Sequence, residues 1–203
     1  MGKLDAKRIG RFISAKLKVS LRNLPKEFHS TFKYTRTGNN YCHPITLSLI
    51  GDAVRQMGDV VHIGYDVRLN KGSGNKFQPD VVGFDAHITP IVCVDFESPN
   101  SSDARVMEKD VAAYAKWAAA HDKYETVPPY IIVTSLPNFT SDDWECRWTG
   151  AGKWNERHKN YVTDIVANPF AYWNRIWAKQ LADYRDQNIA FLNISDSKVM
   201  YVS

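Results

Sequence analysis

The sequence contains few cysteines and no long apolar segment. Its 203 residues include three cysteines, Cys42, Cys93 and Cys146, and no CxxC pair. An odd number of widely spaced cysteines indicates neither a disulfide framework nor a thiolate zinc site. No run approaches the roughly 20 apolar residues that cross a bilayer, and the N-terminus lacks the apolar stretch of a signal peptide. We therefore expect a cytoplasmic protein with reduced thiols and no contact with membranes.

Internal repeats and low-complexity segments are also lacking. Hydrophobic residues make up 44% of the chain and charged residues 24%, as in ordinary globular proteins, and a chain of this length can bury one substantial core. We distinguish a basic helical segment, residues 1–36, from a core at residues 37–203 that ends in a helix and a hairpin. Together they are expected to form one compact domain.

Basic residues are concentrated at the front of the chain. Residues 1–36 hold ten of the 26 basic residues but only two of the 22 acidic ones. Such a segment is typical of a surface that binds phosphate groups, and equally of a solvated helix face. The candidate nucleic-acid-binding residues are Lys7, Arg8, Arg11, Lys16, Lys18 and Arg22, together with Lys153 in a later tryptophan-rich segment.

Hydrophobic periodicity predicts alternating helices and strands. Three strands in sequence should form an antiparallel meander, and a short apolar run after the next helix should add a further strand. This order indicates an α/β domain with a mixed central sheet flanked by helices. The predicted helices cover 9–24, 44–58 (after a turn at 35–43), 104–120 and 169–187; the predicted strands cover 60–69, 80–87, 91–97 and 130–133, with a terminal hairpin at 188–202.

Three carboxylates lie at the ends of two of these strands. Asp80 begins one strand, and Asp95 and Glu97 end the next. Side chains alternate along a strand, so Asp95 and Glu97 should share a face, about 6 to 7 Å apart at the backbone. If the strands pair, Asp80 lies beside them, and the three charges repel unless protons or a cation neutralise them. An oxygen-only site of this kind suits Mg²⁺ or Mn²⁺.

Other residues compete for these roles. Asp85 lies in the same meander as Asp80, and His87 and His121 are possible bases, although a lone histidine is more often a structural group. Trp148 and Trp154, on either side of Lys153, can stack on bases or contact the DNA backbone, but large aromatic residues more often fill a core. An acidic pair at a strand end is also often just a solvated edge.

Two short motifs resemble those of a known nuclease group. The run Pro79 to Val82 and the run Ile91 to Glu97 look like the two core motifs of the PD-(D/E)XK nuclease superfamily, which usually has lysine where this chain has Glu97. The segment from Pro79 to Pro137 resembles Uma-type restriction endonucleases. This second likeness rests on Ser98, Pro99, Asp103, Lys109 and Tyr114.

The resemblance implies a restriction-endonuclease-like fold and a Mg²⁺-dependent deoxyribonuclease that hydrolyses phosphodiester bonds within DNA. Asp80 and Asp95 would be metal ligands, and Glu97 a ligand or the base that orients water. Lys109 would supply the positive charge of the missing strand lysine. The backbone carbonyl of Phe96 and, as a further candidate, Asp52 would complete the metal shell. Symmetric cutting of duplex DNA would imply a homodimer.

Two other functions are compatible with parts of the sequence. A non-catalytic nucleic-acid-binding domain derived from a nuclease would explain Glu97 in place of lysine and the basic front segment. Glycoside hydrolysis is suggested by the run Val94 to Glu97, which looks like the acidic strand of chitinase-like barrels. Those barrels contain eight strand-helix units, and this sequence shows no such repetition.

Overall fold

The computed structural model of the chain forms three helices and eight strands in the residues that it describes. These residues are 5–23, 36–70, 76–97, 104–121, 126–134, 178–179, 182–184, 187–193 and 199–200. The elements, in chain order, are α1 (Ala6–Arg22), α3 (Arg36–Arg55), β1 (His62–Tyr65), β2 (Leu69–Asn70), β3 (Lys76–Phe77), β4 (Val81–Phe84), β5 (Pro90–Glu97), α4 (Ala104–Ala119), β6 (Tyr130–Thr134), β7 (Ile189–Asn193) and β8 (Val199–Met200).

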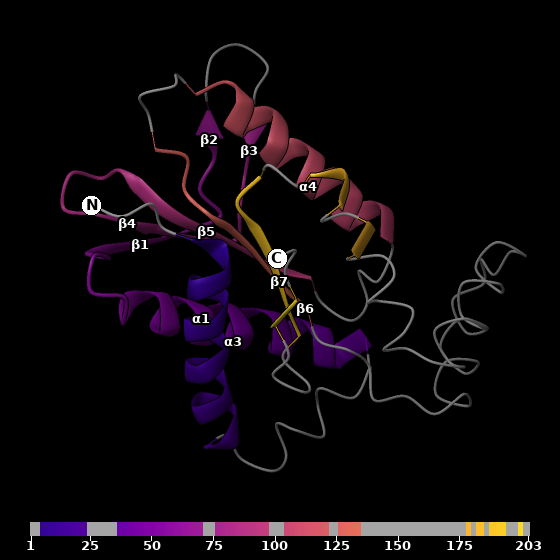
Figure 1. Ribbon diagram of the computed structural model, residues 1–203. Coiled ribbons are helices and arrows are strands. Elements are labelled where there is room, and N and C mark those ends of the chain that lie inside the picture. The colour runs from indigo at the N-terminus through magenta and orange to yellow at the C-terminus, as the bar shows by residue number, and fades with distance from the viewer. Residues whose placement is uncertain are drawn as a thin grey trace, which may run out of the picture.

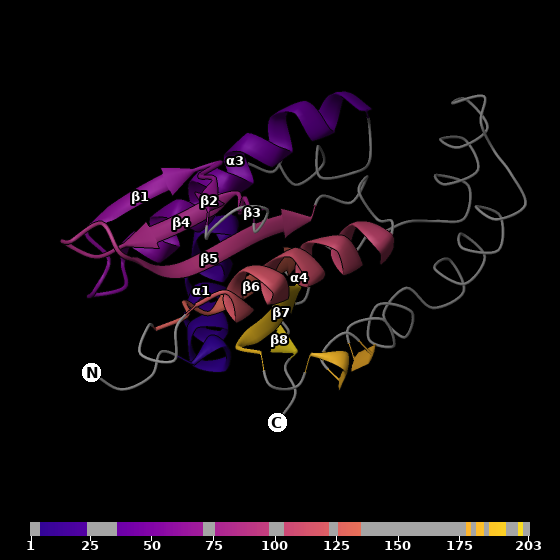
Figure 2. The same cartoon turned by 90° about the horizontal axis from the view of Figure 1, so that it is seen from above.

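Six of the strands form one mixed sheet in the order β1-β4-β5-β6-β7-β8, and β2 and β3 form a separate small hairpin. β4 is antiparallel to both of its neighbours, β1 and β5, whereas β5, β6 and β7 run parallel and β8 is antiparallel to β7. Figures 1 and 2 show the twisted sheet from two directions. The predicted α/β class, with a meander, a further strand and flanking helices, is confirmed.

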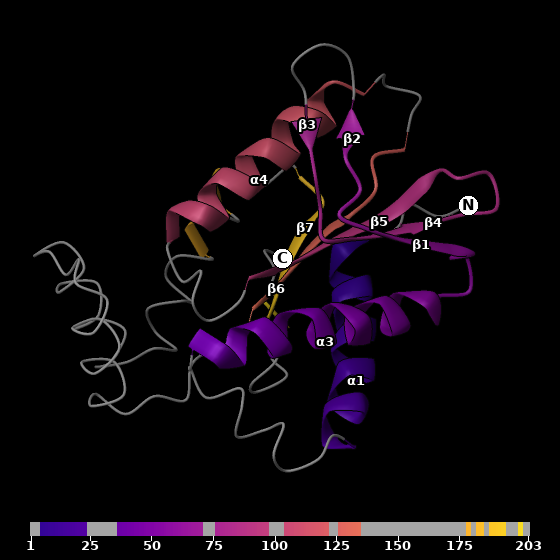
Figure 3. The ribbon, with the colours of Figure 1, turned by 180° about the vertical axis from the view of Figure 1, so that it is seen from behind.

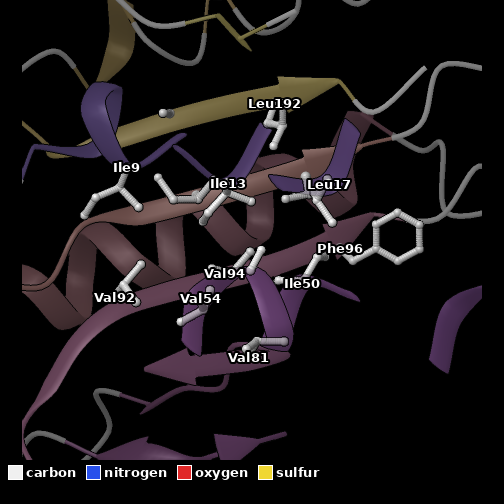
Figure 4. Packing of buried hydrophobic residues seen from close by; sticks show 14 of the residues in the cluster. Ile9, Ile13, Leu17, Ile50, Val54, Val81, Val92, Val94, Phe96 and Leu192 are labelled. Carbon is white, nitrogen blue, oxygen red and sulfur yellow. The ribbon is translucent and has the colours of Figure 1, made fainter. Parts of the chain in front are cut away.

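Helices cover both faces of the sheet, with α1 and α3 on one side and α4 on the other (Figures 1 and 3). On the first side, the buried side chains of α3 pack on β4 and β5 and those of α1 on β6 and β7, in one cluster that includes Val54, Val94 and Leu192 (Figure 4). On the second side, α4 packs on Cys93 and Tyr130. None of the helices in the described part of the chain combines the length and apolar character needed to cross a membrane.

The basic front segment contains a helix that belongs to the core. Ile9, Ile13 and Leu17 follow one another at four-residue steps and are buried, because this spacing places them on one side of the helix. The amide nitrogen of Ala6 at the start of α1 donates to the Asn188 side-chain oxygen over 2.7 Å, which ties the helix to the chain just before β7. The charged residues of α1 are thereby directed away from the sheet.

The second helix begins earlier than the sequence predicts. A turn was expected at 35–43 and a helix start at Pro44, but α3 runs from Arg36 with Pro44 inside it. Proline cannot donate a hydrogen bond to the carbonyl of Asn40, which costs the helix one bond. The helix nevertheless continues, because tertiary packing supplies most of the stability of a helix in a protein, and Ile50 and Val54 of its later turns are fully buried.

The predicted strand at 60–69 is wrong as one continuous element. It is divided between β1 in the large sheet and β2 in the small hairpin. Asp66 lies between them with φ of 52°, a left-handed conformation that aspartate tolerates better than most residues. Its amide donates to the carbonyl of Asp80. This bend directs Val67 and Leu69 toward the cluster under α4.

The other predicted helices and strands are present with shifted ends or lie outside the described residues; the strand predicted at 80–87, for example, is β4 at Val81–Phe84. The helix at 104–120 and the strand at 130–133 are present as α4 and β6, and β7 pairs with β8 antiparallel as the terminal hairpin requires. Trp148, Lys153 and most of the helix predicted at 169–187 lie in the part of the chain that the structure does not describe.

Gly83 in β4 lies where α3 packs closely on the sheet. A Cβ atom at this position would be 2.7 Å from Cγ1 of Val92 and 2.8 Å from Cγ1 of Val54. Gly83→Ala is therefore expected to lower the free energy of unfolding by about 1 to 3 kcal/mol, as overpacking of a core usually does. Gly58→Ala is the matched control, because no atom lies within 4 Å of its Cβ position. Equal stability of the two variants in urea unfolding would contradict the tight approach.

Candidate metal centre

Asp80 and Asp95 lie side by side at one end of the β4–β5 hairpin. Val81 is the partner of Val94 in the antiparallel register. Asp80, which precedes Val81, therefore faces Asp95, which follows Val94. The amide nitrogen of Asp80 donates to Oδ1 of Asp95 over 2.7 Å. In return, the amide nitrogen of Phe96 donates to Oδ2 of Asp80 over 2.8 Å. The structure thus brings together two of the three predicted carboxylates and holds both by main-chain donors.

Tyr130 of β6 holds the other oxygen of Asp95. Its hydroxyl donates to Oδ2 of Asp95 inside the protein. Parallel pairing of β5 with β6 sets Tyr130 beside Cys93, two residues before Asp95 on the same face. Its ring is stacked on Tyr114 with centroids 4.8 Å apart and meets Phe77 edge-on at 5.0 Å. Both oxygens of Asp95 therefore have fixed donors.

Burial makes this pair electrostatically unfavourable when both groups are charged. Asp95 is only 8% exposed. Its burial, and next the negative charge of Asp80, raise the pKa of Asp95 to about 8, against hydrogen bonds from Tyr130 and from the Asp80 amide, which lower it. Burial also raises the pKa of Asp80, although the Phe96 amide opposes the shift. Without a cation, the pair retains a proton at neutral pH.

Three further charged groups act on the pair, and the sequence did not predict any of them. His43 in α3 lowers the pKa of Asp80 by its charge, whereas Asp66 and Asp110 raise it. Asp110 acts on Asp95 in the same direction. The surroundings of the pair therefore contribute two negative charges and one histidine.

The signals for these residues were weak in the sequence. Asp110 is four residues before Tyr114, and residues at that spacing share a helix face, so its place toward the sheet could have been predicted. His43 fell in the segment expected to form a turn. In the structure its ring lies 5.5 Å from the ring of Phe96, centroid to centroid, and it is partly buried. Only the packing of α3 against β5 places His43 beside Phe96.

The other predicted site residues lie at several places around the pair. Glu97 ends β5 opposite Thr134, and the position of its side chain lies outside what the structure describes. Lys109 is exposed on α4, next to Asp110. The side chain of Phe96 is buried in the opposite layer, as expected, and its amide serves Asp80.

Asp52 is exposed on α3, nine residues beyond His43. That separation corresponds to about 13 Å along a helix axis. On the same helix, it is His43 whose charge acts on Asp80.

The competing residues have structural roles. Asp85 lies in the turn at the opposite end of the β4–β5 hairpin, and its Oδ1 accepts hydrogen bonds from the amides of His87 and Thr89, each over 2.8 Å. The bond from the Thr89 amide is the main reason that the pKa of Asp85 is lowered. His121 lies two residues after the end of α4, with Nδ1 3.0 Å from the carbonyl oxygen of Trp117.

The donor set at this end of the hairpin fits part of a shell for a hard divalent cation. Carboxylate oxygens are the ligands that Mg²⁺ and Mn²⁺ prefer, and a carboxylate has about four lone-pair sites, so one hydrogen bond on an oxygen leaves room for a metal bond. Among the side chains that the structure describes, however, no group of three or more His, Cys, Asp and Glu is arranged to hold a metal ion. A complete shell needs further ligands beside Asp80 and Asp95.

Comparison with protein-family models, with curated proteins and with solved structures finds no match to this chain. Functional assignment therefore depends on the geometry and the charges around Asp80 and Asp95.

Proposed function

We propose that this protein is a metal-dependent endonuclease that hydrolyses phosphodiester bonds in DNA, with a fold of the PD-(D/E)XK type. The observation that carries the proposal is a pair of adjacent carboxylates at the end of two antiparallel strands, of which Asp95 is buried and Asp80 is partly buried. The order of the elements, α3, β1, β4, β5, α4 and β6, also supports it. In addition, the two motifs that resemble those of the nuclease superfamily fall at neighbouring positions, at the start of β4 and along β5.

A bound cation would offset the electrostatic repulsion between the two carboxylates, which burial strengthens. Two buried like charges cost free energy unless a proton or a metal ion neutralises one of them. When bound, Mg²⁺ can make a water molecule nucleophilic and stabilise the charge that grows on the leaving oxygen. The raised pKa of Asp95 is typical of a group whose environment serves chemistry better than stability.

Each residue of the candidate site would have a separate role. Asp80 and Asp95 would hold Mg²⁺ or Mn²⁺, with the carbonyl of Phe96 completing the shell. Glu97 would bind the cation or orient water, and Lys109 would stabilise charge on the phosphate. These assignments extend the resemblance to positions that lie on β5 and on the neighbouring α4.

The outer side of α1 would bind the DNA backbone. Five exposed residues follow one another along α1 at three- and four-residue steps, and all but the alanine are basic: Arg8, Arg11, Ala15, Lys18 and Arg22. A stripe of this length matches the arrangement expected for phosphate contacts. Lys7 and Lys16 flank it and are partly buried, with Nζ of Lys16 5.4 Å from the ring centroid of Phe12. A homodimer would allow both strands to be cut.

A cleavage assay tests the proposal directly. Supercoiled, linear duplex and single-stranded DNA, with RNA in parallel, are incubated with the protein and Mg²⁺ or Mn²⁺. We expect DNA fragments that appear only with the metal and disappear when EDTA is added. Absence of cleavage on every nucleic acid with both metals would refute the nuclease function.

Removal of charge from the α1 stripe should weaken DNA binding. The triple variant Arg8→Ala, Lys18→Ala, Arg22→Ala is expected to bind duplex DNA less tightly and with a smaller dependence on salt. Each phosphate contact contributes about 0.9 to the slope of log K against log salt, so three lost contacts should reduce the slope by about 2.7. Fluorescence anisotropy at several salt concentrations measures both quantities.

A second triple variant controls for net charge. Arg55, Lys76 and Lys116 are exposed on α3, β3 and α4, and replacing all three with alanine removes the same charge from other faces. If both variants lose the same part of the slope, the binding is non-specific attraction to total charge, and α1 is not the DNA-binding surface.

A non-catalytic nucleic-acid-binding domain is the second candidate. It is favoured by the finding that Asp80 and Asp95 already receive main-chain hydrogen bonds, as structural carboxylates do. Salt-sensitive DNA binding that is the same in EDTA and in Mg²⁺, without cleavage, would select this function.

A further inference from the structure

Tyr130 is a residue that the sequence did not connect with the carboxylate pair. It lies 35 positions after Asp95, on a different strand, and its hydroxyl donates to Oδ2 of Asp95. The side chain is completely buried. A buried hydroxyl almost always has a hydrogen-bond partner, and here the partner is one of the two proposed metal ligands.

The surroundings of Tyr130 leave its ring little freedom to move. Tyr114 of α4 stacks on the ring, and Phe77 of β3 meets it edge-on, with centroids 4.8 and 5.0 Å away. The backbone of Tyr130 is fixed on both sides, because β6 lies between β5 and β7 in the sheet. The hydroxyl is therefore held in one place by packing from three elements.

Asp95 receives a second fixed donor on its other oxygen, the amide of Asp80. With Oδ1 and Oδ2 both held, rotation of the carboxylate about its Cβ–Cγ bond would break two hydrogen bonds together. These two hydrogen bonds fix the direction of the remaining lone pairs of the carboxylate. Removing a group that orients a metal ligand in this way commonly lowers metal affinity about 10- to 100-fold.

We propose that Tyr130 is a positioning residue of the metal centre, which orients Asp95 for a divalent cation through its hydroxyl. The inference rests on the proposed function, since it requires that Asp95 binds a cation. It goes beyond the assignment of ligands, because it gives the buried aromatic cluster under α4 a role in metal affinity. Tyr130 would not touch DNA or the reacting atoms.

Tyr114 offers a matched control in the same cluster. It is also completely buried, and its hydroxyl donates to the carbonyl of Pro128 over 2.8 Å instead of to Asp95. Tyr114→Phe and Tyr130→Phe each remove one buried hydroxyl and keep the ring. Only Tyr130→Phe removes a donor from the carboxylate pair.

The test measures Mn²⁺ binding by the full chain, with free Mn²⁺ detected by electron paramagnetic resonance. We expect Tyr130→Phe to raise the dissociation constant for Mn²⁺ about 10- to 100-fold and Tyr114→Phe to leave it unchanged, while Asp95→Asn abolishes the binding. In the cleavage assay, Tyr130→Phe should recover activity at high Mn²⁺, with no change in the DNA concentration required for half-maximal rate. That recovery separates positioning from loss of the fold.

The alternatives give different results. Equal Mn²⁺ affinity of the parent and Tyr130→Phe overturns the inference and leaves the nuclease function in place. Equal weakening in Tyr130→Phe and Tyr114→Phe also overturns it, because the cluster would then act through packing alone. A parent that binds no Mn²⁺, or one whose binding survives Asp95→Asn, overturns both the inference and the proposed metal centre.

Discussion

Replacing Asp95 with asparagine should abolish metal-dependent DNA cleavage and at the same time stabilise the metal-free protein at pH 8 and above. The amide has nearly the shape of the carboxylate and still accepts a hydrogen bond from the Asp80 amide, but it has no charge to hold the cation. Loss of a catalytic metal site removes several kcal/mol of transition-state stabilisation, which corresponds to at least about a 1,000-fold slower reaction. Cleavage rates in Mg²⁺ and urea unfolding in EDTA measure the two effects.

Asp85→Asn is the control for this experiment. Asp85 lies in the same hairpin but at its other end, where its carboxylate accepts the amides of His87 and Thr89. This variant should keep the cleavage rate and should not gain stability. A fully active Asp95→Asn protein, or one that is less stable than the parent at pH 8, would show that Asp95 is a structural residue.

The stability of the metal-free protein should fall as the pH rises from about 4 to about 8. The folded pair keeps a proton through this interval, because burial and the charge of Asp80 raise the pKa of Asp95 to about 8. An unfolded aspartate releases its proton near pH 4. The folded state therefore binds more protons than the unfolded state, and the free energy of unfolding decreases by up to about 1.4 kcal/mol per pH unit.

This direction is the reverse of the usual one for a carboxylate that is stabilised by a basic partner. Urea unfolding at fixed ionic strength in EDTA, between pH 4.5 and 8.5, measures the slope. Asp95→Asn should remove most of it, because the group that holds the extra proton is gone. A stability that is flat or rises across this interval in the parent would contradict the electrostatic description of the pair.

Both predictions describe one property of the site. The charged carboxylate pair is unfavourable in the metal-free protein, and a cation that replaces the shared proton stabilises it. Metal binding should therefore release a proton and stabilise the fold. A purely structural pair would show no such coupling. The affinity for Mn²⁺, and the increase in the thermal midpoint that added Mn²⁺ causes, should therefore both rise as the pH increases toward 8.

The sequence predicted the two carboxylates of the candidate site, but not the histidine and the tyrosine beside them. Asp80 and Asp95 were expected to lie together because each is next to a short apolar strand and the strands are close in the chain. Period-two alternation and a short connection determine such a pairing locally. The same reasoning placed Phe96 in the opposite layer, where it is buried.

The histidine and the tyrosine could not be predicted in this way. Tyr130 reaches Asp95 only because β6 pairs with β5 in parallel with a particular register, and that register is a property of the whole sheet. His43 required a helix that passes through Pro44, against the local preference of proline. In both cases packing between distant segments decided the outcome.

The sequence by itself determined the α/β class, the antiparallel meander, the helix after β5 and the neighbouring positions of Asp80 and Asp95, because all of these follow from periodicity over a few residues. The tertiary structure alone decided the division of the strand at Asp66, the burial that raises the pKa of Asp95, and the contact with Tyr130. Desolvation and long-range pairing depend on which segments meet in space, and no local pattern contains that information.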